Sequence, residues 1–487
     1  MADRLSPADA ALLALEDAET PQHAGMVAIC HDPDGRVEQA TLIALVRARL
    51  AEVPRYHQVV REVPGHLAGP VWVDDAAFDL TYHIRRSALP RPGSAAALRE
   101  LVARIMSRPL DRSRPLWEMY LVEGLAGDRF AILTKTHQAL VDGVTTVDLG
   151  QLVLSRSSEA NAATEVADET DRWRAAAAPT SVALVVGAIV DAVRQPTQVV
   201  DHARRSVGDV RDVASKLLGA AATLASTARS AIRPPPGSPL NVRTSAHRLF
   251  ATVDTSLEDY RKIRASLGGS VNDVVLATIA GALRTWLQSR GEAVRAGSTI
   301  RAVVPVSVHD PGGGETGPVG SEVSSYLVDL PVGEPSPAMR LHQVGYATQA
   351  HKDSGRAVAA DVLVRLRGFS PPTLHAVGAR VATTLTRRAS NLVITNVPGP
   401  QVPLYVAGAR LLSTYPVLPV ARGQAVSIGL TSYDGDVHYG LNADRSAMPD
   451  VETLGACITE ALAELLDAAI ASTTPGSGSP GGRASHG

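Results

Sequence analysis

The sequence predicts an α+β protein of two lobes, and three observations lead to this class. The chain has 487 residues, 45% of them hydrophobic, which is more than one ordinary core accommodates. Its first third mixes helical periodicity with β-rich runs. A run with four prolines, residues 233–239, then separates this part from a second part of the same mixed character. We therefore expect lobes at 1–175 and 241–471, connected by residues 176–240.

The first lobe is predicted to mix helices with strands, and two of each are recognisable in the sequence. Apolar residues recur at helical spacing in the two helices, and the strands are rich in β-branched and aromatic residues. The helices are expected at Gln39–Leu50 and Leu98–Ser107, and the strands at Glu118–Val122 and Arg129–His137.

The connection is predicted to be a helical crossover. From about residue 180 to 232, Ala, Val, Arg and Asp recur at helical spacing, and Pro196 is expected to break the run into two helices. Its polar face mixes Asp with Arg and is not distinctly basic, which favours packing between the lobes over binding to a membrane.

The second lobe carries the strongest helix and hairpin signals. Ser270 is a predicted N-cap with Asp273 at the third helical position, and one apolar face follows as far as Ser289. The Asp434-Gly435 pair between two β-rich arms predicts a hairpin. A helix is also expected at 256–267, strands at 247–253, 300–308, 326–330 and 392–396, and a disordered low-complexity tail at 472–487.

Composition excludes several classes of function. The formal charge is -2. The sequence shows no basic stripe with interleaved aromatic residues, which is the pattern that would predict nucleic-acid binding. Cys30 and Cys457 are far apart, which indicates neither a disulfide framework nor a metal site. No secretion signal or membrane-spanning run is recognisable. We expect a cytoplasmic protein whose contact with any membrane or lipid droplet is peripheral.

The most informative stretch is RFAILTKTHQALVDGVTTVDL, residues 129–149. It predicts a strand that ends near His137, a turn at Asp142-Gly143 and a helix from about residue 144. Polar groups at the end of a strand and before a glycine turn commonly line a site. The residues alone equally allow a structural turn with His137 hydrogen-bonded in the core.

This stretch resembles the HHxxxDG motif of the bacterial wax ester synthase/diacylglycerol acyltransferase family. Chloramphenicol acetyltransferase and peptide-synthetase condensation domains share a shorter form of it. Other stretches agree with the family in order from about Leu5 to Leu466: LSPADAALLALEDAETPQHAGMVAI, Pro-Leu-Trp at 115–117, Asn-Asp at 272–273, SSYLVDLPV, NLVITNVPGP and TSYDGDVHYGLNADRSAMPD.

The resemblance implies two chloramphenicol-acetyltransferase-like lobes with a tunnel between them. Long-chain acyl-CoA would enter from one side as a substrate, and diacylglycerol or a fatty alcohol from the other, with no further cofactor and no metal. In such enzymes the second His of the motif removes the hydroxyl proton, while the Asp holds the loop. The matching catalytic positions are His137, Gln138, Asp142 and Gly143. Asn272 and Asp273 would line the substrate tunnel, although capping a helix explains Asp273 equally well.

The chain departs from this pattern at the catalytic base. Gln138 stands where the family has its second His, and a carboxamide does not titrate. His137 is not a simple replacement, because neighbouring residues of a strand point to opposite faces. Ser321 also replaces an Asn that is common in the family.

Three functions remain open on these grounds. The first is an acyl-CoA-dependent O-acyltransferase that makes triacylglycerol or wax ester, slowed by Gln138. The second is a catalytically inactive lipid-binding relative that retains the tunnel. The third is an acyltransferase for another nucleophile, such as an amine, which attacks a thioester with less need of a base.

Overall fold

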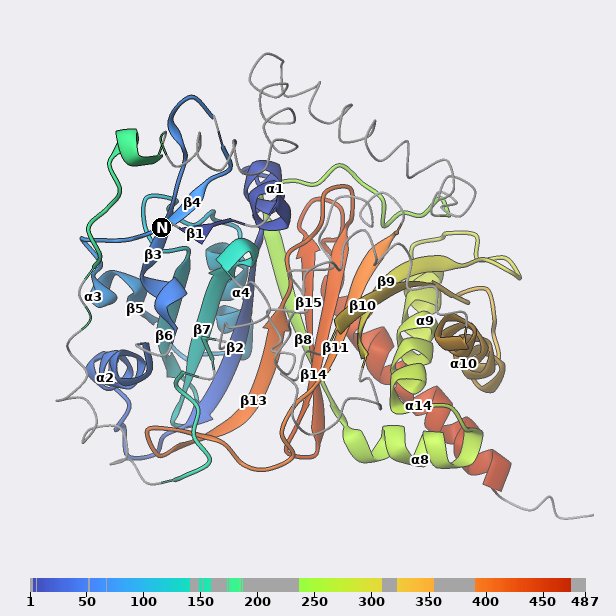
Figure 1. Ribbon diagram of the computed structural model, residues 1–487. Helices are drawn as coiled ribbons and strands as arrows, with labels where there is room; N and C mark the ends of the chain where they lie inside the picture. Colours follow the sequence, from blue (N-terminus) through green and yellow to red (C-terminus); the bar gives the residue numbers. More distant parts are fainter. Residues whose placement is uncertain are drawn as a thin grey trace, which may run out of the picture.

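A computed structural model describes residues 3–140, 149–158, 175–186, 236–308, 322–353 and 390–473, together with Trp173 and apart from positions 6, 51, 52, 67, 151, 174 and 185. Most of the predicted crossover, Asp142-Gly143, Ser321 and most of the predicted tail lie outside these residues, and the described start of the crossover, residues 181–184 and 186, is helical. The described elements form two lobes, each built on a six-stranded sheet (Figure 1).

The first sheet has the strand order β12-β13-β2-β7-β6-β5. Its members are β2 (His23–His31), β5 (Ile84–Ala88), β6 (Trp117–Leu125), β7 (Arg129–His137), β12 (Tyr405–Val406) and β13 (Ala409–Val417). The strand predicted at 129–137 is confirmed as β7, and the one predicted at 118–122 lies within β6. The antiparallel register of β2 and β7 places His23 directly opposite His137 at one end of the sheet.

Helices cover both faces of the first sheet, because successive strand residues point to opposite sides. Met26 and Ile132 face the core that includes α2 (Gln39–Leu50). Val27 and Leu133 face the core that includes α4 (Ala95–Met106). Both predicted helices are confirmed, although α4 begins three residues earlier, after its N-cap Ser94.

Smaller elements complete the first lobe. A three-stranded sheet with the order β1-β4-β3 lies beside it. The remaining elements are β1 (Asp3–Arg4), α1 (Pro7–Leu15), the 3-10 turns η1 (Pro54–His57), η2 (Pro64–His66) and η3 (Gln138–Leu140), β3 (Gln58–Arg61), β4 (Val71–Asp74) and α3 (Leu80–His83).

The second sheet has the order β10-β9-β11-β14-β15-β8, with β11 parallel to both of its neighbours. Its strands are β8 (Arg248–Ser256), β9 (Ile300–Val308), β10 (Glu322–Leu330), β11 (Leu392–Pro398), β14 (Val426–Tyr433) and β15 (Asp436–Asp444). Its helices are α8 (Leu257–Leu267), α9 (Val271–Ser289), α10 (Pro337–Asp353) and α14 (Val451–Thr473). These helices pack against the sheet in one large core (Figure 1).

The signals read from the second lobe are confirmed in detail. Ser270 and Asp273 form a reciprocal capping box at the start of α9. Asp434 and Gly435 connect β14 to β15 with positive φ angles of 46° and 96°, as the tight hairpin requires. Two boundaries were too short: β11 continues to Pro398, and α14 continues to Thr473 beyond the predicted end of the lobe.

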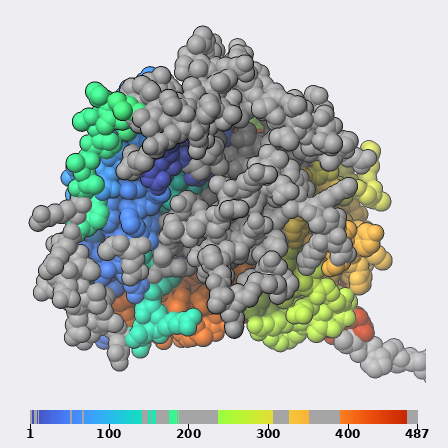
Figure 2. Space-filling view, in the orientation of Figure 1, coloured from blue at the N-terminus to red at the C-terminus, as the bar shows by residue number. Residues whose placement is uncertain are grey.

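The two sheets meet along β13, which belongs to the first sheet although it comes late in the sequence. Gly429 and Gly440 are paired across β14 and β15, and both lie against Pro416 of β13. A Cβ atom on Gly440 would lie 1.9 Å from the carbonyl oxygen of Pro416. Glycine is therefore required for this close approach. In the space-filling view, the first-lobe residues (blue) lie on the left and α8 (yellow-green) at the lower right (Figure 2).

Candidate functional site

The candidate site is built around the end of β7, where the backbone leaves the sheet. His137 is 0% exposed and Gln138 is 1% exposed. The N–H of His137 donates to the carbonyl of Leu116 at 2.9 Å, and the N–H of Gln138 donates to the carbonyl of Gln22 at 2.9 Å. Both residues are thus fixed by backbone bonds to neighbouring segments of the first lobe.

The imidazole of His137 is held on both sides. The N–H of Ala139 donates to its Nδ1 at 3.0 Å. An amide N–H can only donate, so this bond makes Nδ1 the acceptor and places the ring proton on Nε2. Nε2 lies 3.7 Å from Oε2 of Glu16. In this arrangement His137 shapes the turn, and both of its ring nitrogens face protein groups.

Glu16 is the acidic partner in this arrangement, and its side chain is only 4% exposed. Its carboxylate accepts from the N–H of Gln22 at 3.0 Å and from Arg112 at 2.8 Å. Burial opposes ionisation, but His137, Gln22 and Arg112 together hold the pKa of this carboxyl well below its usual range. Glu16 therefore ties the segment before β2 to the end of β7.

The segment between α1 and β2 is itself rigidly turned. Asp17 Oδ1 accepts from the N–H groups of Glu19 and Thr20 at 3.0 and 2.8 Å. The side chain of Gln22 donates to the carbonyl of Thr20 at 2.9 Å. The carbonyl of Gln22 is consequently in a fixed position when it accepts from Gln138.

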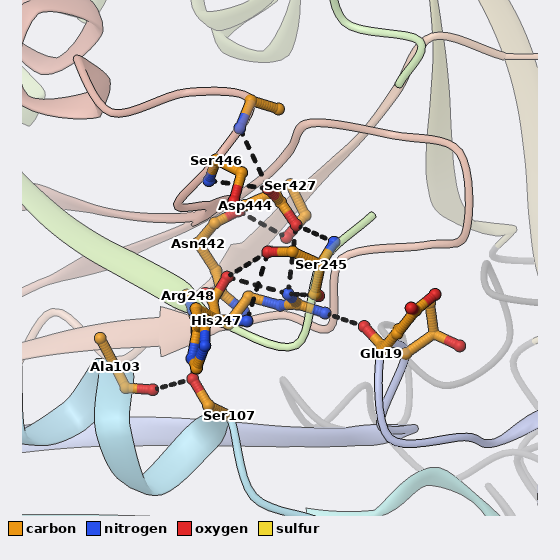
Figure 3. A network of polar contacts seen from close by, with 12 residues as sticks. Glu19, Ala103, Ser107, Ser245, His247, Arg248, Ser427, Asn442, Asp444 and Ser446 are labelled. Carbon is orange, nitrogen blue, oxygen red and sulfur yellow. Dashed lines mark hydrogen bonds and ion pairs between the residues drawn. The ribbon is translucent and has the colours of Figure 1, made fainter. Parts of the chain in front are cut away.

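A buried arginine links this segment to the second lobe (Figure 3). Arg248 of β8 lies 3.5 Å from the buried carboxylate of Asp444, and it donates to the carbonyl of Glu19. Its backbone N–H donates at 3.1 Å to Ser107, which follows α4. The lobe junction and the candidate site therefore share one polar network.

Gln138 has chemistry unlike that of a histidine at the same place. Its carboxamide offers both N–H donors and an acceptor oxygen but no titrating group. It can hold a hydroxyl or stabilise a developing negative charge, but it cannot remove a proton. Asp142 and Gly143, the other predicted members of the motif, lie outside the described residues.

Asn272 and Asp273 occupy the first turn of α9. Asp273 is 5% exposed, and its carboxylate accepts from the N–H and hydroxyl of Ser270 at 2.8 and 2.7 Å. It also accepts from the hydroxyl of Thr348 at 2.6 Å. These bonds give Asp273 a capping and packing role. Its predicted contact with substrate stays a prediction.

Asn272 is half-buried and belongs to a different polar group. Its Oδ1 accepts from the amide of Asn396 at 3.2 Å. Tyr326 lies beside it, and burial raises the pKa of this tyrosine to about 12, so its hydroxyl is neutral. The strand containing Asn396 continues beyond this residue. The strand predicted to end at Asn396 is therefore two residues longer than expected.

Several residues that shape the site were not predicted from the sequence. Glu16 and Arg112 lie far from the HQALVDG stretch in sequence, and nothing in their spacing pairs them. Lys135 is 1% exposed and precedes His137 on the same strand face. Its position inside a β-rich run was a usable signal, because lysine is rarely fully buried.

Trp117 of the Pro-Leu-Trp stretch packs in the core of the first lobe. It is 0% exposed, and its indole N–H donates to the carbonyl of Tyr56 at 2.9 Å. Its ring stacks on His83. Among the residues that the structure describes, no group of three or more His, Cys, Asp or Glu side chains could hold a metal ion.

Comparison with known protein families gives two matches along the chain. The model of the wax ester synthase/diacylglycerol acyltransferase catalytic domain matches residues 5–275. The model of the C-terminal domain of the same proteins matches residues 319–466.

Individual relatives cover either nearly the whole chain or about half of it. The chain is 31% identical over 468 residues to the "Probable diacyglycerol O-acyltransferase tgs1" of Mycobacterium tuberculosis, which spans 95% of this chain and 96% of the relative. It is 41% identical over 266 residues to tgs3 of the same organism, 54% of this chain and 96% of the relative.

Solved structures give the same picture of the fold. The wax ester synthase/diacylglycerol acyltransferase from Marinobacter aquaeolei VT8 matches with a TM-score of 0.68 at 28% identity, over 96% of this chain and 99% of that one. The first condensation domain of the calcium-dependent antibiotic synthetase matches with a TM-score of 0.54 at 15% identity, over 96% and 97% of the two chains. The second match concerns the fold alone and agrees with the predicted two-lobe architecture.

Proposed function

This chain belongs to the wax ester synthase/diacylglycerol acyltransferase family and is an acyltransferase, and we propose that it esterifies diacylglycerol or a long-chain alcohol with the acyl group of a long-chain acyl-CoA. The acceptor oxygen attacks the thioester carbonyl carbon, the carbon–sulfur bond breaks, and CoA leaves as the thiol with the proton that the hydroxyl loses.

The observation that carries the proposal is the intact framework around position 138. Gln22 holds the backbone of Gln138, and Ala139 and Glu16 fix the ring of His137. A reacting group at position 138 is thereby held in one place, and such positioning supplies a large part of catalysis without any proton transfer.

In this proposal Gln138 orients the acceptor and does not deprotonate it. Its carboxamide oxygen accepts the hydroxyl hydrogen bond, or its N–H groups donate to the oxyanion that forms as the oxygen attacks. General base catalysis typically contributes about 100- to 10,000-fold. We therefore expect slow turnover, which positioning and polar stabilisation sustain.

A direct assay tests the activity. Purified protein is incubated with a long-chain acyl-CoA and either diacylglycerol or hexadecanol, while free CoA and the ester product are both measured. Product that depends on the acceptor supports the proposal. Acyl-CoA binding without ester formation would refute it, provided that the amount of enzyme is about 10,000-fold above the amount that gives a measurable rate for an active relative.

Gln138 also favours two other functions, which the same assay separates. A lipid-binding relative without activity would bind acyl-CoA and release no CoA. An acyltransferase for amines would release CoA when a long-chain amine replaces the alcohol, because a neutral amine attacks a thioester with less help from a base. Replacing the acceptor therefore decides between the three.

We further propose that the protein meets its lipid acceptors at a membrane or lipid-droplet surface from the cytoplasmic side. Among the described residues, no single helix is long and apolar enough to cross a bilayer, and the one pair that reaches this length, α8 with α9, is bent by 100°. Co-flotation with lipid vesicles tests this contact. Protein that stays at the bottom of the gradient would contradict it.

A further inference from the structure

A cationic pocket lies on the first lobe beside the strand that ends at His137. Its volume is about 410 Å³, within the usual range for sites that hold small molecules. The pocket is lined from the sheet by Glu118, Tyr120 and Lys135. Arg104 lines it from α4, and Arg108 lines it from the segment that follows this helix.

The pocket has an excess of positive charge. Four basic and two acidic side chains line it, which gives a net charge of about +2 when all are ionised. Glu118 is already engaged, because it lies 3.0 Å from Arg85 and 3.9 Å from Lys135. Asp111 accepts from the N–H and hydroxyl of Ser113. Glu118 is therefore already paired with cations, whereas Asp111 keeps its charge, which the net value of about +2 includes.

Two arginines remain without such a partner. Lys135 donates to the carbonyls of Ile105 and Arg108 and so fastens the end of α4 to the sheet. In the described part of the chain, the guanidinium groups of Arg104 and Arg108 make no ion pair and no hydrogen bond. Arg104 lies in the last turn of α4 and Arg108 is the second residue after the helix. Both side chains are exposed and line the pocket.

We propose that Arg104 and Arg108 bind the phosphate groups of the acyl-CoA substrate in this pocket. Arginine forms paired, charge-assisted hydrogen bonds to phosphate oxygens. The negative charge of a phosphate would balance the net positive charge of the pocket. This assignment rests on the proposed use of acyl-CoA. The pocket also lies close to the candidate site, because the Cα atoms of Lys135 and Gln138 are at most about 11 Å apart. The extended pantetheine arm of CoA is long enough to span this distance.

The test compares CoA binding by calorimetry in three forms of the full chain. The test variant is Arg104→Gln/Arg108→Gln. The control is Arg261→Gln/Lys262→Gln, which removes two positive charges from α8, where both side chains are more than half exposed. Each lost charge-assisted bond weakens binding by about tenfold or more. We expect the dissociation constant for CoA to rise at least tenfold in the test variant and to stay unchanged in the control.

Two further measurements identify the ligand. Inorganic diphosphate should compete with CoA in the wild-type protein. Vesicles of phosphatidic acid in phosphatidylcholine test a lipid phosphate as the alternative source. If the test variant loses binding to these vesicles but keeps its affinity for CoA, the assignment to CoA is overturned.

The outcome is independent of whether the protein forms esters. Equal CoA affinity in the test variant and the wild type overturns the pocket assignment even if the wild type is active. Weaker CoA binding in the test variant alone supports it even if no ester appears. In an active protein, the KM for acyl-CoA should rise while kcat is unchanged.

Discussion

Replacing Gln138 by histidine is the perturbation that tests the site most directly. The backbone at this position is fixed by the 2.9 Å bond to Gln22, and the side chain is 1% exposed. A histidine placed here inherits the position of the family's base, while Glu16 and Ala139 continue to hold His137. We therefore expect Gln138→His to raise the rate of ester formation.

The size of the gain follows from what a base contributes. General base catalysis supplies about 100- to 10,000-fold, which corresponds to about 2.7 to 5.5 kcal/mol of activation free energy. The gain depends on the neutral form of the new imidazole. An unperturbed histidine has a pKa of about 6.5, so most of it is neutral slightly above pH 7.

Burial decides where the acidic limb of the rate profile lies. His57 and His83 of the same lobe are buried, and burial lowers their pKa to about 4. The buried histidine at 138 should behave similarly, so its pKa should lie between about 4 and about 6.5. Below that pKa the ring is protonated and the rate falls; above it the rate is constant.

The assay measures ester formation by wild type, Gln138→His and Gln138→Ala across the acidic to neutral range. The alanine variant is the matched control, since it removes the carboxamide without adding a base. His137→Ala in the natural protein completes the set. If it abolishes a robust native activity while Gln138→His adds nothing, then His137 is the working base and the assignment of its nitrogens is wrong.

Three further predictions concern the framework that holds the site. Glu16→Gln should lower the free energy of unfolding by about 3 kcal/mol, as loss of a buried ionic partner does, measured by urea denaturation. The pKa of Glu16 is lower in the folded than in the unfolded protein. The stability that its carboxylate contributes is therefore complete above the unfolded pKa of about 4.3 and is lost as pH falls through the lower folded value. Equal acid sensitivity of the variant and the wild type would contradict this. Asp273→Ala should lower the free energy of unfolding by about 1 to 3 kcal/mol, because the helix cap and the hydrogen bond to Thr348 are lost. An unchanged melting temperature together with weakened substrate binding would instead indicate direct contact with the substrate. Arg248→Met should lower the free energy of unfolding by about 3 to 5 kcal/mol, because it leaves the Asp444 carboxylate buried and unpaired. A change below about 1 kcal/mol in a melting experiment would argue against the network of Figure 3.

The elements that were predicted well are those whose signals are local. The capping box at Ser270 and the Asp434-Gly435 turn depend on residues within one turn of chain, and the structure reproduces both. The strand that ends at His137 was likewise predicted to the residue. Boundaries that depend on packing were less accurate, as the longer β11 shows.

The substitution at position 138 was also recognisable without a structure, because the resemblance to the family motif predicts which position Gln138 occupies. The partners of that motif were not visible. Glu16 and His137 are separated by 121 positions in the chain, and they meet because β2 pairs with β7. The same sheet brings Lys135 to the end of α4 and so forms the cationic pocket.

By itself the sequence determined the α+β class, the family, and the absence of a titrating group at position 138, because periodicity and motif order are properties of the chain alone. Only the tertiary structure decided that His137 lies between Glu16 and Ala139. It also decided that the carboxylate of Asp273 accepts hydrogen bonds from Ser270 and Thr348, and that β13 joins the first sheet. Those outcomes depend on which distant segments pair, and pairing is governed by the burial of whole sheet faces, which no local pattern specifies.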